Sequence, residues 1–314
     1  MGGRMAGPLG LAALGAFLVA DIVLVGLAVR STAAVPTGSA GKDRPAADSG
    51  VSAGGAATPT TGGTDSAPAA APTSLTAAPL TVGLVAVDDH TAWRFDTGTC
   101  ADGGSTVAVT DDGGKTWQPR VAPFDVTVRL RVRDNGSAFA IGADGDCRAR
   151  FRQSDDQAQD WDTSAAVPGV WYRDPKDAAV VGTEARTKAK PCDSAGVVDL
   201  AVDDDSATAL CGDGTILASR AGREWSLEAT VDGALAIALA GDRTLALVTV
   251  PECAGLAVVD AAKPEEVRGC APADLGAVSA GQLALAGKGA TVWVAAGSAV
   301  LRSSGDLAEW TTAG

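Results

Sequence analysis

Short segments in which apolar residues alternate with polar ones, or follow one another directly, recur along the last two thirds of the chain. Four of them cover residues 106–110, 149–153, 215–219 and 299–302. Runs of this length and pattern predict buried or half-buried β-strands. Each run leads into a polar turn that ends in a tryptophan, so the pattern predicts an all-β domain built from a repeated unit.

The first of these turns is the most complete copy, Thr110-Asp-Asp-Gly-Gly-Lys-Thr-Trp117. Asp112 is placed to accept hydrogen bonds from backbone N–H groups inside the turn. Gly114 suits a positive φ, which a Cβ atom disfavours. Trp117 then begins the next strand, and its large apolar surface is expected to fill a gap between neighbouring sheets.

The other three turns keep parts of this pattern. The second copy retains its Ser, Asp and Trp, the third its Ser, Gly and Trp, and the fourth only its ends. The defining residues are Thr110, Asp112, Gly114, Thr116 and Trp117; Ser154, Asp156 and Trp161; Ser219, Gly222 and Trp225; and Ser303 and Trp310.

The turn resembles the Asp box of sialidase-type (BNR-repeat) β-propellers, and the resemblance covers residues 82–314. It implies a turn between the two outer strands of a four-stranded blade. A repeat of about 30–45 residues, with unmarked blades near residues 193 and 268, predicts six blades. Because residues 168–192 are short and poorly patterned, five or seven blades remain alternatives.

The N-terminus carries a long apolar segment. Residues 5–29 contain one charged side chain, Asp21, and are long enough to span a bilayer as a helix. We expect an uncleaved anchor with residues 1–4 in the cytoplasm; a cleaved signal, with Ala33-Ala34 near the cleavage site, is the alternative. Asp21 is interpreted either as a helix–helix contact or as a tolerated acid.

Residues 30–80 are rich in Ala, Thr, Pro, Gly and Ser and predict a disordered linker before a propeller domain at 81–314. Residues 1–80 carry four basic and four acidic residues, so the net charge of −13 belongs to the propeller. An acidic domain repels nucleic acid and anionic lipid, which excludes a DNA or RNA partner. The Ala-rich, Lys-poor composition is typical of a bacterium with a GC-rich genome.

Six cysteines lie in the predicted propeller, and none is spaced for metal binding with the single histidine, His90. An even number behind an anchor predicts disulfides in an oxidising compartment. Fifteen pairings are open. Proximity in the blade arrangement favours Cys100–Cys147, Cys192–Cys211 and Cys253–Cys270.

Two arginine trios are the strongest candidate ligand-binding residues. Both fall in the predicted second blade, and alternation places each trio on one strand face. Guanidinium groups suit carboxylates and phosphates, which predicts an anionic ligand such as a cell-envelope glycan or an acidic protein tail. The alternative is an ion-pair ladder with Asp88, Asp89, Asp155 or Asp156. The trios are Arg129, Arg131 and Arg133, and Arg148, Arg150 and Arg152.

Catalysis receives weak support from the sequence. Tyr172-Arg173-Asp174-Pro175 faintly resembles the (Tyr/Phe)-Arg-Ile-Pro motif of sialidases, where an arginine holds the substrate carboxylate and a separate tyrosine–glutamate pair does the chemistry. Tyr172 is the only tyrosine. A core role for Trp171 and Tyr172 is favoured instead. The acidic stretches at 203–205 and 144–146 are read as solvated turns rather than calcium sites, so no metal or cofactor is expected.

The sequence therefore predicts a monomeric, membrane-anchored propeller on the extracytoplasmic side of the cell membrane, acting as a non-enzymatic binding or scaffold module. A sialidase-like glycoside hydrolase is the alternative. A third hypothesis is an assembly factor for a membrane complex, in which Asp21 would be a contact.

Overall fold

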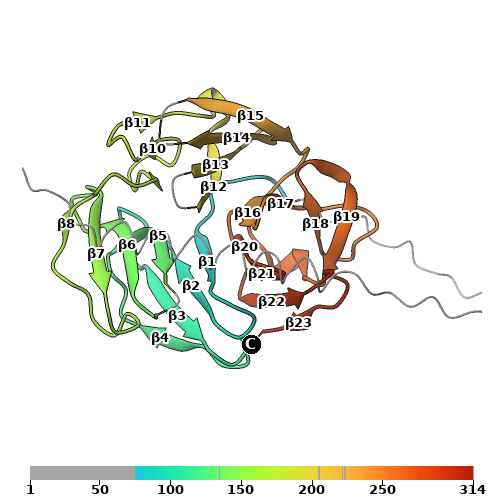
Figure 1. Ribbon diagram of the computed structural model, residues 1–314, viewed down its shortest axis with the longest axis horizontal. Helices are drawn as coiled ribbons and strands as arrows, with labels where there is room; N and C mark the ends of the chain where they lie inside the picture. Colours follow the sequence, from blue (N-terminus) through green and yellow to red (C-terminus); the bar gives the residue numbers. More distant parts are fainter. Residues whose placement is uncertain (1–74, 134, 204–205, 221, 223, 314) are drawn as a thin grey trace, which may run out of the picture. The chain divides into compact units, whose positions relative to one another are not determined.

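A computed structural model describes residues 75–133, 135–203, 206–220, 222 and 224–313 of this protein. The strands form six antiparallel sheets arranged around a common centre (Figure 1). In every sheet, strands that are consecutive in sequence are neighbours, and in the five four-stranded sheets the first strand lies nearest the centre. The described part of the chain is thus a six-bladed β-propeller, as the repeat predicts.

Five blades have four strands. Blade 1 comprises β1 (Val82–Ala86), β2 (Ala92–Asp96), β3 (Thr106–Thr110) and β4 (Gln118–Arg120). Blade 2 comprises β5 (Val126–Val132), β6 (Ala138–Ala143), β7 (Arg150–Ser154) and β8 (Ala165–Ala166). Blade 4 comprises β12 (Val197–Asp203), β13 (Ser206–Cys211), β14 (Thr215–Arg220) and β15 (Trp225–Thr230). Blade 5 comprises β16 (Ala236–Ala240), β17 (Arg243–Val248), β18 (Leu256–Asp260) and β19 (Lys263–Ala271). Blade 6 comprises β20 (Leu283–Lys288), β21 (Thr291–Ala296), β22 (Ala299–Ser304) and β23 (Thr311–Thr312).

Blade 3 departs from the expected four strands. It has three strands of two residues each: β9 (Tyr172–Arg173), β10 (Val181–Gly182) and β11 (Lys188–Ala189). Its sequence contains Pro168, Pro175 and Pro191, and proline cannot donate to a strand ladder. Two short 3-10 helices, Asp193–Ala195 and Leu275–Ala277, precede blades 4 and 6.

The turn at residues 110–117, which we call an Asp-box turn after the motif it resembles, has the predicted geometry. The Thr110 hydroxyl donates to Asp112 Oδ1 at 2.8 Å and accepts the Gly114 N–H at 2.8 Å. Asp112 also accepts the backbone N–H and the hydroxyl of Thr116 at 3.0 and 2.8 Å. Ser154, Asp156 and Ala158 repeat the first two bonds in blade 2 at 2.7 and 2.9 Å.

The backbone of the turn persists where glycine has been lost. Four residues after the opening Ser or Thr stand Gly114, Ala158 and Leu307, with φ of 89°, 59° and 65°. Ala158 and Leu307 are both buried. A left-handed backbone is unfavourable for residues other than glycine. The burial of the Ala158 and Leu307 side chains compensates for this cost.

Each of these turns packs against the preceding blade. Trp161 Nε1 donates to Val121 O at 2.8 Å, and Trp225 stacks edge-on against Trp171 at 5.5 Å. A Cβ added at Gly269 of blade 5 would overlap the backbone of Leu307 in blade 6. The tryptophan-ended turns are therefore the links between blades that the sequence predicts.

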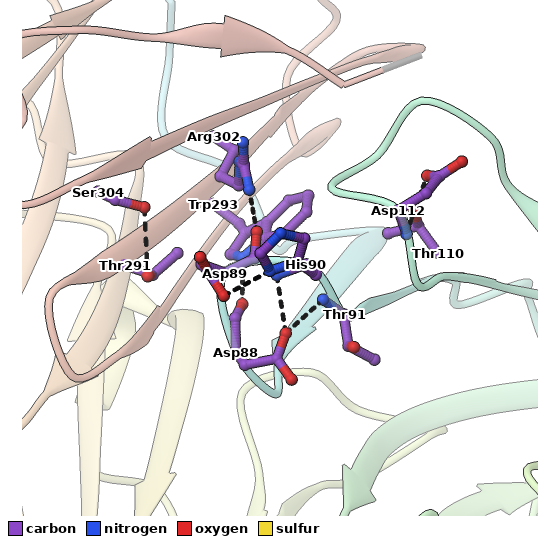
Figure 2. A network of polar contacts seen from close by, with 10 residues as sticks. All are labelled: Asp88, Asp89, His90, Thr91, Thr110, Asp112, Thr291, Trp293, Arg302 and Ser304. Carbon is purple, nitrogen blue, oxygen red and sulfur yellow. Dashed lines mark hydrogen bonds and ion pairs between the residues drawn. The ribbon is translucent and has the colours of Figure 1, made fainter.

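Blade 1 and blade 6 meet at a contact that we call the seam. Each blade comes wholly from its own end of the domain, so no strand is shared across the seam. Trp117 stacks edge-on against Trp293 at 6.4 Å, and Trp293 Nε1 donates to Asp88 O at 3.1 Å. Arg302 donates to Asp89 O beside it (Figure 2). Side-chain contacts thus close the ring.

Three disulfides have the predicted pairing. Cys100–Cys147 joins blades 1 and 2, and Cys253–Cys270 lies within blade 5. Cys192–Cys211 connects the segment before β12 to the end of β13 in blade 4. All six cysteines are described, and none is free.

Residues 75–81, which we call the leading segment, lie against the propeller although the linker was expected to run to residue 80. Leu75 and Ala77 pack on the largest core cluster, among blades 4 to 6. Leu80 is buried and its N–H donates to Val198 O at 3.0 Å. The buried apolar side chains and the backbone hydrogen bond order this segment, although the residues before it are mostly small or polar.

The described range begins at residue 75, so the expected cytoplasmic end at 1–4, the anchor at 5–29 and residues 30–74 of the linker lie outside it. Within that range no helix has the length and apolar character needed to cross a membrane.

Candidate functional site

The inner strands of the six blades enclose a central cavity of about 300 Å³. Most of the residues that line it are apolar, among them Val82, Leu130 and Ile237. Among the described lining residues, four are basic and two are acidic: Arg129, Arg131, Arg173 and Lys288, with Asp199 and Asp203. The cavity is therefore positively charged within a strongly acidic domain, which favours an anionic ligand group.

Arg129 lies where blade 2 faces the short blade 3. Its guanidinium donates to Trp171 O and lies 5.2 Å from the centre of the Phe139 ring. Burial, reinforced by the neighbouring charge of Arg131, lowers the pKa of Arg129 to about 10. The side chain stays cationic at neutral pH and is held rigidly by a carbonyl and an aromatic face.

Arg173 and Asp199 form the second polar group of the cavity. Arg173 donates to Val198 O at 3.0 Å and to Leu80 O at 2.6 Å, so it ties blade 3 to the leading segment. Asp199 accepts the N–H of Ile237 at 2.9 Å and thereby links blades 4 and 5. Burial lowers the pKa of Arg173 and raises that of Asp199, because desolvation of each charge outweighs their mutual attraction.

Tyr172 lines the same cavity as Arg129, Arg131 and Arg173. This grouping matches part of what a sialidase-like site requires. However, the guanidinium groups of Arg129 and Arg173 bind backbone carbonyls rather than converging on one point. Burial raises the pKa of Tyr172, which disfavours its ionisation to a nucleophile, and no glutamate is found among the described lining residues.

The two arginine trios do not come together. Arg129 pairs with Ile141, which pairs with Phe151 on the third strand. Arg152 instead pairs with Ala140, one residue out of phase with Ile141. Because alternate residues of a strand face opposite sides, the trios lie on opposite faces of blade 2.

The second trio is engaged within its own blade. Arg150 binds Asp146 at 3.1 Å and Arg152 binds Asp144 at 3.3 Å. These are ion pairs, as the alternative interpretation proposed, but their partners are in the β6–β7 turn rather than Asp88, Asp89, Asp155 or Asp156. Arg133 and Arg148 are exposed.

The acidic stretches at 144–146 and 203–205 lie in different places, the first in the β6–β7 turn and the described residue of the second, Asp203, at the central cavity. Asp144 and Asp146 are occupied by these arginines, and Asp203 lines the central cavity. Residues 204 and 205 lie outside the described range.

A cluster that the sequence did not single out lies in the β1–β2 turn. The side chains of Asp88, Asp89 and His90 bring potential metal-ligand atoms within 4.8 Å of one another (Figure 2). All three are exposed. The Asp88 carboxylate accepts hydrogen bonds from the N–H groups of His90 and Thr91 at 2.7 and 2.6 Å. Desolvation raises the pKa of Asp88, but these hydrogen bonds outweigh it, so the pKa is lowered. The cluster is explained as a hydrogen-bonded turn at the seam.

Comparison with known proteins gave no match to any family model and none to curated proteins. Solved structures with a similar fold include YCF48 bound to D1 peptide, 17% identical over 76% of this chain and 81% of that chain, with a TM-score of 0.39. YCF48 from Cyanidioschyzon merolae is 16% identical over 75% and 86% of the two chains, with a TM-score of 0.35. A lectin from Aleuria aurantia in complex with a fucoside is 10% identical over 74% and 93%, with a TM-score of 0.44. The fold of this chain is defined by its own six sheets.

Proposed function

We propose that this protein is a membrane-anchored binding module outside the cell membrane, and that its central cavity receives an acidic group of a protein tail or of an envelope glycan. The observation that carries the proposal is the excess of basic over acidic groups lining this cavity, in a chain of net charge −13. Guanidinium groups suit carboxylates and phosphates.

The proposed location rests on the cysteines and on the N-terminal sequence. Three disulfides use every cysteine of the chain, and such bonds persist in oxidising compartments. An apolar segment at 5–29 and a polar linker precede them. Together they favour an anchor with the propeller on the extracytoplasmic side.

The binding test uses two variants matched in charge and in blade. Full-length tagged chain is crosslinked in its native membrane as wild type, Arg131→Gln and Arg148→Gln. Arg131 lines the cavity, whereas Arg148 is exposed in the turn between β6 and β7. We expect the captured partner to be depleted by Arg131→Gln alone. Equal capture by all three chains would contradict a site in the cavity, and mass spectrometry distinguishes a protein partner from a glycan.

The location is tested by thiol labelling in intact cells. A membrane-impermeant maleimide should label no cysteine before reduction and should label Cys100, Cys147 and Cys270 after it, since the other three are buried. Free thiols in the unreduced chain would contradict an oxidising compartment.

Hydrolysis is the second candidate, because Tyr172 shares the cavity with three arginines. Hydrolysis is tested by measuring the turnover of a fluorogenic sialoside by the wild type and by Tyr172→Phe. The non-enzymatic proposal expects no turnover that depends on the Tyr172 hydroxyl.

A further inference from the structure

The two faces of blade 1 differ in chemistry. Trp93 and Phe95 on β2 are buried in the core that blade 1 shares with blade 2. Arg94 and Asp96 occupy the alternate positions and pair with Ala108 and with Thr106 on β3. The face of blade 1 that looks toward blade 6 is therefore polar in its outer part.

A second cavity, of about 280 Å³, lies on this polar face. We call it the seam pocket; it is lined by Arg94, Asp96, Thr106, Ala108 and Trp117 of blade 1 and by Ser298 and Val300 of blade 6. It shares no lining residue with the central cavity. Its volume is at the lower end of the range for ligand pockets, which suits one small ring rather than an extended chain.

The polar groups of the pocket are held in place by the fold. Arg94 donates to Gly297 O at 2.8 Å and to Ser298 O at 3.0 Å, which fixes its guanidinium across the seam. These bonds use two of its five N–H groups. Asp96 Oδ2 accepts the Thr106 hydroxyl at 2.6 Å.

The other carboxylate oxygen of Asp96 is 3.8 Å from the nearer Arg94 nitrogen, which is longer than a hydrogen bond. The carboxylate therefore keeps acceptor capacity toward the pocket. About half of the Asp96 side chain is exposed, at 47%, against 20% for Arg94. A ligand in the pocket can reach both groups.

The charges and the aromatic wall select the kind of ligand. Arg94 and Asp96 carry opposite charges, so the described pocket is close to neutral and does not favour an ion. A carboxylate beside a guanidinium offers an acceptor and donors to adjacent hydroxyl groups. The indole of Trp117 also lines the pocket and offers apolar surface to the C–H groups of a ring, and its Nε1 is already bonded to Ala313 O at 3.2 Å.

We propose that the seam pocket is a carbohydrate-binding site for one neutral pyranose unit of a glycan. The ring stacks on Trp117, adjacent hydroxyls donate to Asp96, and the remaining N–H groups of Arg94 bind ring or hydroxyl oxygens. This site is separate from the central cavity and does not depend on the anionic ligand proposed for it.

The test titrates full-length chain in phosphatidylcholine nanodiscs, which avoid sugar-based detergents, with methyl glycosides of glucose, galactose, mannose and fucose. Tryptophan fluorescence and saturation-transfer NMR report binding. The variants are Asp96→Asn and Ala108→Leu, which remove a charged acceptor and fill the pocket. The controls are Asp111→Asn, an exposed acid of the same blade, and Arg131→Gln in the central cavity.

We expect at least one glycoside to bind saturably with a millimolar or lower Kd. Asp96→Asn should weaken it by about 10-fold or more, as expected for a hydrogen bond to a charged group. Ala108→Leu should do the same without removing a polar group, which keeps the test valid if Asp96→Asn does not fold. Both controls should bind as wild type does. No binding of any glycoside at about 10 mM, or binding unchanged in both variants, would overturn the site.

Discussion

Trp117 Nε1 donates a hydrogen bond to the backbone oxygen of Ala313, 196 residues later in the chain, at 3.2 Å. This bond joins the first Asp-box turn to the end of the last blade. Since no strand crosses the seam, a side chain from the start of the domain and a carbonyl from its end help to close the ring.

Replacing Trp117 by leucine should loosen this closure. The change removes one hydrogen bond and much of the indole surface packed against Trp293. We expect a loss of stability of about 2–3 kcal/mol, less than for a fully buried tryptophan because Trp117 is half-buried. Thermal melting in nanodiscs, followed by circular dichroism, measures it. Val121→Ala, at an exposed residue, is the control and should melt with the wild type.

The left-handed positions of the Asp boxes should respond to substitution with opposite signs. Gly114→Ala would place a Cβ onto Ala313 at a φ of 89°, so it should cost more than about 1 kcal/mol. Gln157 is exposed and has a φ of 61°, a conformation that glycine adopts more easily than glutamine. Gln157→Gly should therefore stabilise the fold by up to about 1 kcal/mol. The two melting temperatures, compared with wild type, check both signs. A destabilised Gln157→Gly chain would show that the turn gains more from the side chain than it loses to the backbone.

The disulfides should differ in their contribution to stability. Cys100–Cys147 closes a loop of 47 residues, whereas Cys192–Cys211 closes one of 19. In the chain-entropy account, these loops correspond to about 4 and about 3 kcal/mol. Double Cys→Ser variants of each pair, melted side by side, should therefore rank with the longer loop as the more costly loss. The reverse order would point to strain or denatured-state structure in the longer loop.

Asp112 should make the propeller sensitive to acid. Hydrogen bonds from the backbone and hydroxyl of Thr116 lower the pKa of Asp112 from 3.8 to about 2. A carboxyl with a lowered folded-state pKa stabilises the fold above its unfolded pKa. That contribution is lost as pH falls from about 4 to about 2. Melting temperature against pH should drop in this window in the wild type.

Asp112→Asn should have a smaller drop over the same pH range, although it is less stable at neutral pH. Asp111→Asn, at an exposed position in the same turn, is the matched control and should retain the full pH dependence. Identical profiles for all three chains would show that other acids dominate the response.

Much of the seam pocket could have been read from one strand. The sequence Trp93-Arg-Phe-Asp96 alternates large apolar residues with charged ones, which predicts one buried and one polar face. What it could not show is that the polar face meets blade 6 rather than water, because residues about 200 positions away supply the opposite wall. The sequence also marks Asp199, because it is the one acidic residue in the apolar run of residues 197–202.

The sequence by itself determined the local features of this protein. The Asp-box turns need only residues within about seven positions of one another, because short polar side chains bond their own backbone. Their spacing favoured six blades over five or seven, and the blade arrangement favoured the one cysteine pairing, of fifteen, that the structure has.

Only the tertiary structure decided which side chains share a space. The two arginine trios look alike in sequence, yet the pairing register of β5, β6 and β7 places them on opposite faces of one blade. Arg129 and Arg131 of one trio line the central cavity, whereas Arg150 and Arg152 of the other form ion pairs with the turn acids Asp146 and Asp144. The face that a residue takes depends on long-range register, since one step along a strand reverses it.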